Sequence, residues 1–296
     1  MQDDVVKEGS AVLRKLRDYY LLMKFTLSFT VVFSCVISYL LVPEVRFDLV
    51  SVLLLFVGGM LVTGSANAIN QVVEKDTDAL MRRTSLRPVA AGRMGADEAW
   101  TFAAVTGILG IFLLGWWFNT TTAVISMFSL FLYGFIYTPL KKVHSIAVLV
   151  GAIPGALPCL IGWVAGADAL TPGGWILFSL QFVWQFPHFW AIAWVSYNDY
   201  SRAGFKLLPS SGGPTKHAAV QAILYSVILV PIGLLPFVTG MSGKMSLYVV
   251  LIANLFMVWQ CIRLFREMDV KAARRVMFSS YIYLPVVLLA LYADKM

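Results

Sequence analysis

The chain has 296 residues, of which 59% are hydrophobic and 13% are charged, and its formal net charge at pH 7 is +7. Soluble globular domains carry roughly 25% charged residues, so this composition excludes a water-soluble protein and predicts one embedded in a lipid bilayer. The positive charge lies in short loops between apolar segments, which excludes a basic soluble domain, and we expect no nucleic-acid partner.

Nine apolar segments, each long enough to cross a bilayer, follow one another along the chain. They show no strict alternation of apolar and polar residues, and lipid cannot satisfy free backbone groups, so we predict transmembrane helices. The sequence therefore predicts an all-α integral membrane fold in one domain over residues 1–296, with residues 1–17 as an N-terminal tail. The predicted helices cover residues 19–41, 49–70, 97–118, 121–138, 146–165, 174–197, 217–238, 245–265 and 274–292.

The predicted loops carry very unequal numbers of Lys and Arg residues. If the N-terminus is cytoplasmic, 19 of these residues lie on the cytoplasmic side and 3 on the other. Such a bias marks the cytoplasmic face of membrane proteins. Asp3, Asp4 and Glu8 argue against a mitochondrial transit peptide, and no cleavable signal pattern stands before the first apolar segment. We therefore predict a multi-pass protein of the bacterial cytoplasmic (inner) membrane.

Acidic and amide side chains concentrate at the end of the second apolar segment. Asn70, Glu74 and Asp78 are spaced by four residues, so a continuing helix would place them on one face, within a fan of roughly 80°, with Asn67 at its border. Oxygen ligands without His or Cys suit Mg²⁺. Amides inside an apolar segment usually face a bundle interior, which favours a metal site over a solvated helix end.

Arginine residues follow this cluster directly. Arg83 and Arg87 lie within ten residues of Asp78. Beside a carboxylate cluster, guanidinium groups can hold a diphosphate through paired hydrogen bonds. The alternative is that they are ordinary positive residues of a cytoplasmic loop.

A second polar cluster follows the segment 174–197. Asp199 is the only carboxylate of this loop and would hold a second Mg²⁺ opposite the first cluster. Arg202 and Lys206 follow it and are candidates to contact phosphate, and Tyr200 lies between them and Asp199. The two clusters lie on the same predicted side of the membrane, so we expect them to form one site.

The same segment ends in an aromatic run around His188. Its rings would line a pocket for a flat apolar ring or a prenyl chain, or else form an interfacial aromatic belt. His188 itself has three alternative roles: a ligand to a haem-like iron, a proton carrier, or a structural group within the bundle.

Several of these stretches together resemble the UbiA-type membrane prenyltransferases. Residues 65–93 resemble the first aspartate-rich motif of that superfamily. The runs at 137–141, 151–163 and 187–190, with Asp199 and Tyr200, resemble its branch of protohaem IX farnesyltransferases. The resemblance covers roughly residues 15–290 and implies a UbiA-type fold of nine transmembrane helices around a central cavity.

The resemblance also implies an activity. Members of that branch transfer a farnesyl group from farnesyl diphosphate to the vinyl group of haem b, giving haem O, with Mg²⁺ bound to the diphosphate. Metal ions and fixed cations neutralise the charge of the departing diphosphate, and an apolar cavity keeps water from the allylic cation. The implied partners are farnesyl diphosphate, haem b, the lipid bilayer, and haem A synthase or oxidase assembly proteins.

Site roles are carried over from the resemblance by matching position. The implied metal-binding and catalytic residues are Asn70, Glu74, Asp78 and Asp199. The family usually has aspartate where Glu74 stands, and often an acidic residue where Asn198 stands. The implied substrate-binding residues are Asn67, Lys24, Arg83, Arg87, Lys141, His188, Tyr200, Arg202 and Lys206.

Two other functions compete with this interpretation. The first is a related prenyltransferase that acts on an aromatic acid in quinone biosynthesis, but the run at 187–190 favours haem. The second is a membrane transporter or haem carrier. Transporters place ionisable residues near the membrane midplane, whereas the charges here cluster at one membrane edge.

Overall fold

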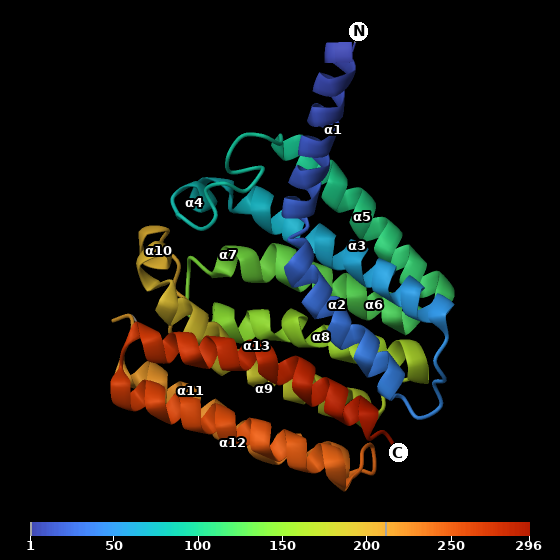
Figure 1. Cartoon of the computed structure of the whole chain (residues 1–296), viewed down its shortest axis with the longest axis vertical. Helices are drawn as coiled ribbons and strands as arrows, with labels where there is room; N and C mark the ends of the chain where they lie inside the picture. The colour runs from blue at the N-terminus through green and yellow to red at the C-terminus, as the bar shows by residue number, and fades with distance from the viewer. Residues whose placement is uncertain (1, 211) are drawn as a thin grey trace.

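The fold consists of long helices packed side by side (Figure 1). The computed structural model describes residues 2–210 and 212–296, with side chains from Ala11 onward. No β-strand occurs in these residues; Ser242 and Lys295 form one isolated bridge. The predicted all-α class is therefore confirmed. Met1 and the side chains of residues 2–10, which include the acidic residues of the predicted tail, lie outside the described part.

The chain orders its helices in two successive sets. The first set is α1 (Gln2–Leu22), α2 (Phe25–Leu41), α3 (Leu49–Val73), the short α4 (Lys75–Ala79), α5 (Ala96–Trp117), α6 (Thr120–Phe131), the π-helical η1 (Leu132–Tyr137) and α7 (Thr138–Leu140). The second set is α8 (Ala147–Ala167), α9 (Pro172–Val195), the short α10 (Tyr197–Arg202), α11 (Lys216–Val238), α12 (Lys244–Glu267) and α13 (Val270–Ala293).

The long helices are suited to a membrane by length and composition. Among the described residues, seven helices are long and apolar enough to span a bilayer, and the bent pair α1–α2 brings the number to eight. Helix α9 covers the remaining predicted segment and is long enough, but its Gln, Trp and His residues lower its hydropathy. The multi-pass architecture is thus confirmed, and the count of nine spans stays a prediction.

The first predicted span is not one straight helix. The chain bends by 49° between residues 11–22 and residues 25–41. Lys24, at the break, has the left-handed backbone conformation (φ 48°), which costs a non-glycine residue about 1–3 kcal/mol. Its side chain donates a hydrogen bond to Asn70, which offsets part of this cost. Residues 2–17, predicted as a tail, are helical and belong to α1.

Helices α8 and α9 form the interior of the bundle. Gly162 on α8 lies so close to the carbonyl of Cys35 on α2 that any added Cβ would overlap it. Trp184, Trp190 and Trp194 of α9 are buried in the largest apolar cluster, beside α11 and α13. These three indole rings therefore belong to the protein core and not to an interfacial belt.

Three connecting segments meet at one end of the bundle. Helices α4, α7 and α10 lie together at that end in Figure 1. They follow α3, η1 and α9, which all run toward it. Because the polar clusters of the sequence lie on these connections, the fold collects them around one region.

Candidate active site

The first polar cluster lies where α3 ends. Helix α3 stops at Val73, and Glu74 (φ −98°, ψ 9°) separates it from α4, so the continuous helix expected over residues 70–78 is interrupted. The amide of Glu74 still bonds the carbonyl of Asn70, and the amide of Asp78 bonds the carbonyl of Glu74. This four-residue pattern keeps Asn70 (2% exposed), Glu74 (4%) and Asp78 (0%) directed inward.

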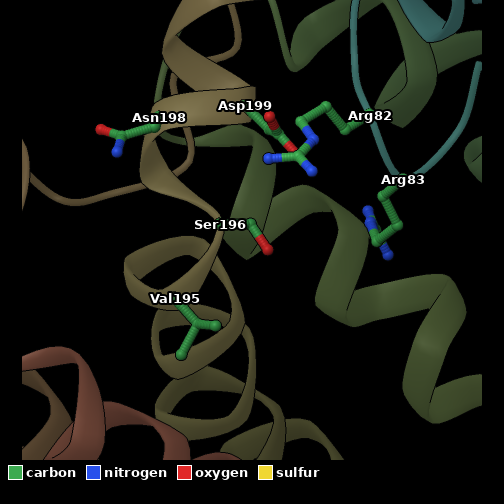
Figure 2. A pocket seen from close by; sticks show the side chains of 6 residues that line it. All are labelled: Arg82, Arg83, Val195, Ser196, Asn198 and Asp199. Atoms are coloured by element: carbon green, nitrogen blue, oxygen red, sulfur yellow. The ribbon is translucent and has the colours of Figure 1, made fainter.

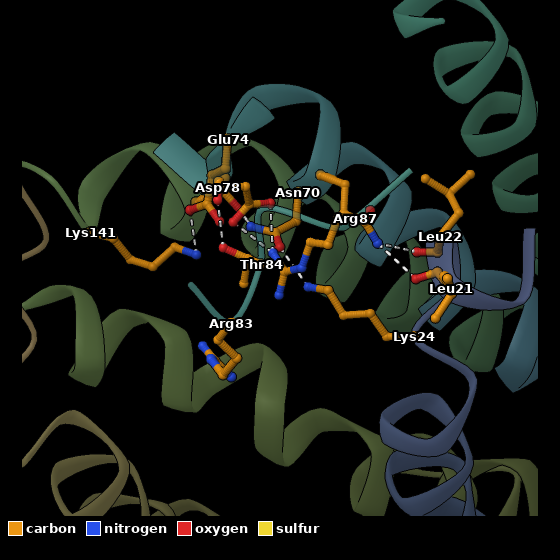
Figure 3. A network of polar contacts seen from close by, with 12 residues as sticks. Leu21, Leu22, Lys24, Asn70, Glu74, Asp78, Arg83, Thr84, Arg87 and Lys141 are labelled. Carbon is orange, nitrogen blue, oxygen red and sulfur yellow. Dashed lines mark hydrogen bonds and ion pairs between the residues drawn. The ribbon is translucent and has the colours of Figure 1, made fainter. Parts of the chain in front are cut away.

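Each of these three polar groups contacts a cation from another part of the chain (Figure 3). The pairs are Lys24 Nζ with Asn70 Oδ1 (2.6 Å), Lys141 Nζ with Glu74 Oε1 (2.5 Å), and Arg87 Nη1 with both oxygens of Asp78 (2.8 and 2.7 Å). A carboxylate buried in a low-dielectric interior is stable only with such a countercharge. The site is therefore a network of alternating charge assembled from four segments.

Two aromatic rings lie beside the ammonium group of Lys141. Its ammonium lies 4.9 Å from the ring centroid of Tyr137 and 5.3 Å from that of Phe205, within the range of cation–π attraction. Its backbone carbonyl accepts a hydrogen bond of 2.8 Å from the amide of Lys206. Lys141 thus connects the first cluster with the loop after α10.

The second cluster faces an open pocket of about 480 Å³ (Figure 2). Arg82 and Arg83 line it from the first loop, and Ser196, Asn198 and Asp199 line it from the second loop. Asp199 forms an ion pair with Arg202, three residues along the same short helix. In Figure 2 the side chain of Asn198 points away from Asp199 and the two arginines, so its amide is not placed to bind a metal together with Asp199.

Direct contacts hold the two loops together. Arg83 Nη2 donates a hydrogen bond of 2.9 Å to the hydroxyl of Tyr200. Met81 of the first loop is buried in a small apolar cluster with Ala203 and Phe205 of the second. The structure therefore brings together the first loop, Lys141 and the second loop, while the joint metal site that the sequence led us to expect stays a prediction.

Two predicted residues make contacts of a structural kind. The amide nitrogen of Asn67 donates to the carbonyl of Met23 (3.1 Å) and to Ser28 Oγ (3.0 Å), across the bend between α1 and α2. Lys206 Nζ donates to the carbonyl of Val143. Their predicted roles in substrate binding stay predictions.

His188 lies inside the bundle. Its Nδ1 is 2.8 Å from Ser280 Oγ on α13, and its ring stacks on Trp184 at 4.7 Å. Since Nδ1 is engaged, only Nε2 could approach an iron atom. The predicted contact with a porphyrin stays a prediction.

The sequence did not single out several residues that shape the site. Thr138 Oγ1 lies 3.4 Å from the amide nitrogen of Asn70. Thr84 Oγ1 donates to the carbonyl of Asp78 and closes the turn after α4. Thr138 belongs to the run at 137–141 that carried the family resemblance, so it could have been found there. Thr84 and the ring of Phe205 had no comparable signal.

The donor set of the first cluster is compatible with a divalent cation. It offers oxygen atoms only, as Mg²⁺ prefers. Glu74 Oε1 is buried and, although Lys141 Nζ is 2.5 Å away, no hydrogen-bond donor of the described residues is aligned on it. The described residues contain no group of three His, Cys, Asp or Glu side chains close enough to bind a metal alone. A metal here would therefore complete its coordination with the amide oxygen of Asn70, water or oxygen atoms of a ligand.

Comparison with known proteins adds an independent finding. The model of the UbiA prenyltransferase family matches residues 31–283. A protoheme IX farnesyltransferase of Cytophaga hutchinsonii is 43% identical over 279 residues, which are 94% of this chain and 97% of that protein.

Two solved structures have the same fold. A digeranylgeranylglyceryl phosphate synthase has a TM-score of 0.78 at 22% identity, and the match covers 95% of this chain and 98% of that chain. A UbiA homologue from Archaeoglobus fulgidus, bound to GPP and Mg²⁺, has a TM-score of 0.69 at 16% identity, covering 93% and 99%.

Proposed function

Because the chain belongs to the UbiA prenyltransferase family and is therefore a prenyltransferase, we propose that it transfers a farnesyl group from farnesyl diphosphate to haem b, giving haem O. The observation that carries this proposal is the 43% identity with the Cytophaga hutchinsonii protoheme IX farnesyltransferase over 94% of this chain. The cationic and carboxylate network at one end of the bundle supports it. Family membership sets aside the transporter alternative.

The chain's own cations are the groups that would bind the diphosphate. Lys24, Arg83, Arg87 and Lys141 come from three segments and converge on the two loops. Guanidinium groups match the geometry of phosphate oxygens, and fixed positive charge stabilises a leaving diphosphate. Because Arg87 and Lys141 are paired with Asp78 and Glu74, we expect the diphosphate to share these cations with the carboxylates.

Mg²⁺ is the metal that fits the carboxylates. Asn70, Glu74 and Asp78 would hold one ion from the first loop, and Asp199 a second from the other loop. Bound there, Mg²⁺ supplies charge neutralisation to the diphosphate. The buried positions of Glu74 and Asp78 would orient the ligand, while Asp199 is half-buried and paired with the exposed Arg202, so it can change partners as the ligand enters.

The proposed reaction has a simple balance of atoms. The C1–O bond of farnesyl diphosphate breaks, and its electron pair leaves with the diphosphate. The terminal vinyl carbon of haem b forms the new bond to C1. Water then adds to the cation beside the porphyrin ring and loses a proton, which leaves the hydroxyethylfarnesyl group. The aromatic rings of Tyr137 and Phe205 would help to exclude other water from the first step.

Topology and location complete the proposal. We place the end that carries α4, α7 and α10 in the cytoplasm, because the basic loops lie there. The protein is then a single nine-span domain of the bacterial cytoplasmic membrane, with residues 1–17 on the cytoplasmic side. Haem A synthase or oxidase assembly proteins would receive the product.

The test is a reaction with purified full-length protein. Farnesyl diphosphate, Mg²⁺ and haem b are incubated with it, and products are identified by mass spectrometry. We expect haem O, and none when Mg²⁺ is chelated. Consumption of an aromatic acid precursor of quinones, without haem O, would overturn the proposal and support the related prenyltransferase.

A further inference from the structure

A basic groove of about 1000 Å³ lies between α1 and the loop after α4. Its inner end is lined by Lys24, Arg83 and Arg87, which contact Asn70, Tyr200 and Asp78 respectively. The groove is therefore continuous with the site where we propose that the diphosphate binds.

The outer end of the groove has cations that the proposed chemistry does not use. Arg14 and Arg17 on α1 line it, and both side chains are exposed. Neither has a carboxylate partner among the side chains that the structure describes. By contrast, Arg93 of the same groove is bound to Asp18. Arg17 and Arg14, which have no such partner among the described side chains, thus precede Lys24 by about two and three helical turns.

An apolar wall joins the two charged ends. Tyr20, Leu21, Phe25 and Leu86 line the groove and are exposed to it or to solvent. The rings of Tyr20 and Phe25 stack at 5.0 Å and present a flat surface. The groove therefore suits a large, flat, apolar molecule with anionic groups at one edge.

We propose that this groove binds the porphyrin acceptor, with its two propionates on Arg14 and Arg17 and its vinyl edge toward Lys24, Arg83 and Arg87. The proposal rests on the proposed function. In haem b the propionates lie on the opposite half of the ring from the vinyl groups, so anchoring the propionates at the outer end directs the vinyl edge to the diphosphate. Helix α1 separates Arg17 and Arg14 from Lys24 by roughly 10 and 15 Å, comparable with the span of a substituted porphyrin.

The size of the groove also favours a porphyrin over a small aromatic acid. Pockets of about 300–1000 Å³ hold drug-sized ligands, and this groove is at the upper end of that range. A single-ring acid would fill only a small part of it and would not reach both charged ends.

The test compares two double variants of the full-length protein. Arg14→Gln/Arg17→Gln removes the two outer cations, and Lys271→Gln/Arg274→Gln, at the exposed start of α13, is the matched control for lost charge. Each is titrated with haem b and with haem b dimethyl ester, whose propionates are neutral. We expect haem b affinity to fall about tenfold in the first variant, as two exposed ion pairs predict, and to stay unchanged in the control.

The dimethyl ester tests whether the two arginines act on the propionates or on another part of the molecule. We expect the dimethyl ester to bind the wild type about as weakly as haem b binds the Arg14→Gln/Arg17→Gln variant, with no further loss in that variant. Unchanged haem b affinity in the variant, in a preparation whose wild type makes haem O, would overturn the groove assignment alone. The assignment would also be overturned if the Arg14→Gln/Arg17→Gln variant kept its haem b affinity and showed a raised KM for farnesyl diphosphate, or kept its haem b affinity and lost binding to phosphatidylglycerol vesicles. Failure of the wild type to make haem O would overturn the proposed function.

Discussion

The two polar loops of the site are built in different ways. The first loop buries its carboxylates: Asp78 is 0% exposed and pairs with Arg87 nine residues along the same loop, and Glu74 is 4% exposed and pairs with Lys141 from a distant segment. The second loop has one carboxylate, the half-buried Asp199, paired with the exposed Arg202 at i,i+3 on a helix of six residues. A buried ion pair is costly to break, whereas an exposed one contributes little.

This difference suggests a division of work between the loops. The first loop is pre-organised, because its charges can only be buried when all the segments are in place. The second loop can exchange Arg202 for a ligand at small cost. Four tests, taken from the largest expected effect to the smallest, examine this difference, and equal effects in both loops would contradict it.

The largest effect is expected for Asp78→Asn. It keeps the shape of the side chain but leaves the Arg87 guanidinium without a charged partner and removes a proposed metal ligand. We expect haem O formation to fall by about 10²–10³-fold, as when a single preorganised electrostatic group is lost, and the free energy of unfolding to fall by about 3 kcal/mol. Product formation and thermal unfolding in detergent measure the two effects.

Lys141→Met tests the buried pair with Glu74 directly. Both side chains are at most 10% exposed, so removal of the cation leaves a buried carboxylate, and we expect a loss of about 3 kcal/mol in unfolding free energy. The double variant Lys141→Met/Glu74→Leu removes both charges and should recover most of that stability. If the double variant is no more stable than Lys141→Met, the unpaired charge of Glu74 is not the cause of the lost stability.

Asp199→Asn should separate activity from stability. Its carboxylate is proposed to bind metal but is paired only with an exposed arginine, so we expect activity to fall by at least about tenfold while the unfolding free energy changes by less than about 0.5 kcal/mol. Initial rates over a range of Mg²⁺ concentrations are the measurement, and partial recovery at high Mg²⁺ is the expected signature. A large loss of stability would show that the Asp199 carboxylate, like those of the first loop, is needed for folding, and would contradict the difference between the loops.

The smallest effect is expected for Arg202→Gln. The pair it breaks is exposed and local, and such pairs contribute about 0.3–0.5 kcal/mol. The melting temperature should therefore remain within error of the wild type. The matched change in the first loop, Arg87→Gln, should lower it clearly, because it leaves the buried Asp78 carboxylate uncompensated.

The helices themselves were largely predictable. The predicted segment 97–118 corresponds to α5 (Ala96–Trp117), and the segment 217–238 to α11 (Lys216–Val238). Hydropathy is a local property, and a membrane forces each apolar segment to satisfy its own backbone hydrogen bonds, so these boundaries follow from nearby residues. Family membership followed in the same way from short motifs, as the match over residues 31–283 confirms.

Other features depended on contacts between distant segments. No local pattern of the sequence predicted the bend at Lys24, the end of α3 before Glu74, or the burial of the α9 indole rings. Left-handed backbone at a lysine is unfavourable alone and is stabilised here by a bond to α3.

By itself, the sequence determined the membrane class, the positions of most helices and which residue types crowd one end of the bundle. Only the tertiary structure decided that Asn70 bonds Lys24, Glu74 pairs with Lys141, and Asp78 pairs with Arg87. The physical reason is that hydropathy acts residue by residue, whereas the partner of a buried charge depends on which segments packing brings within a few ångströms.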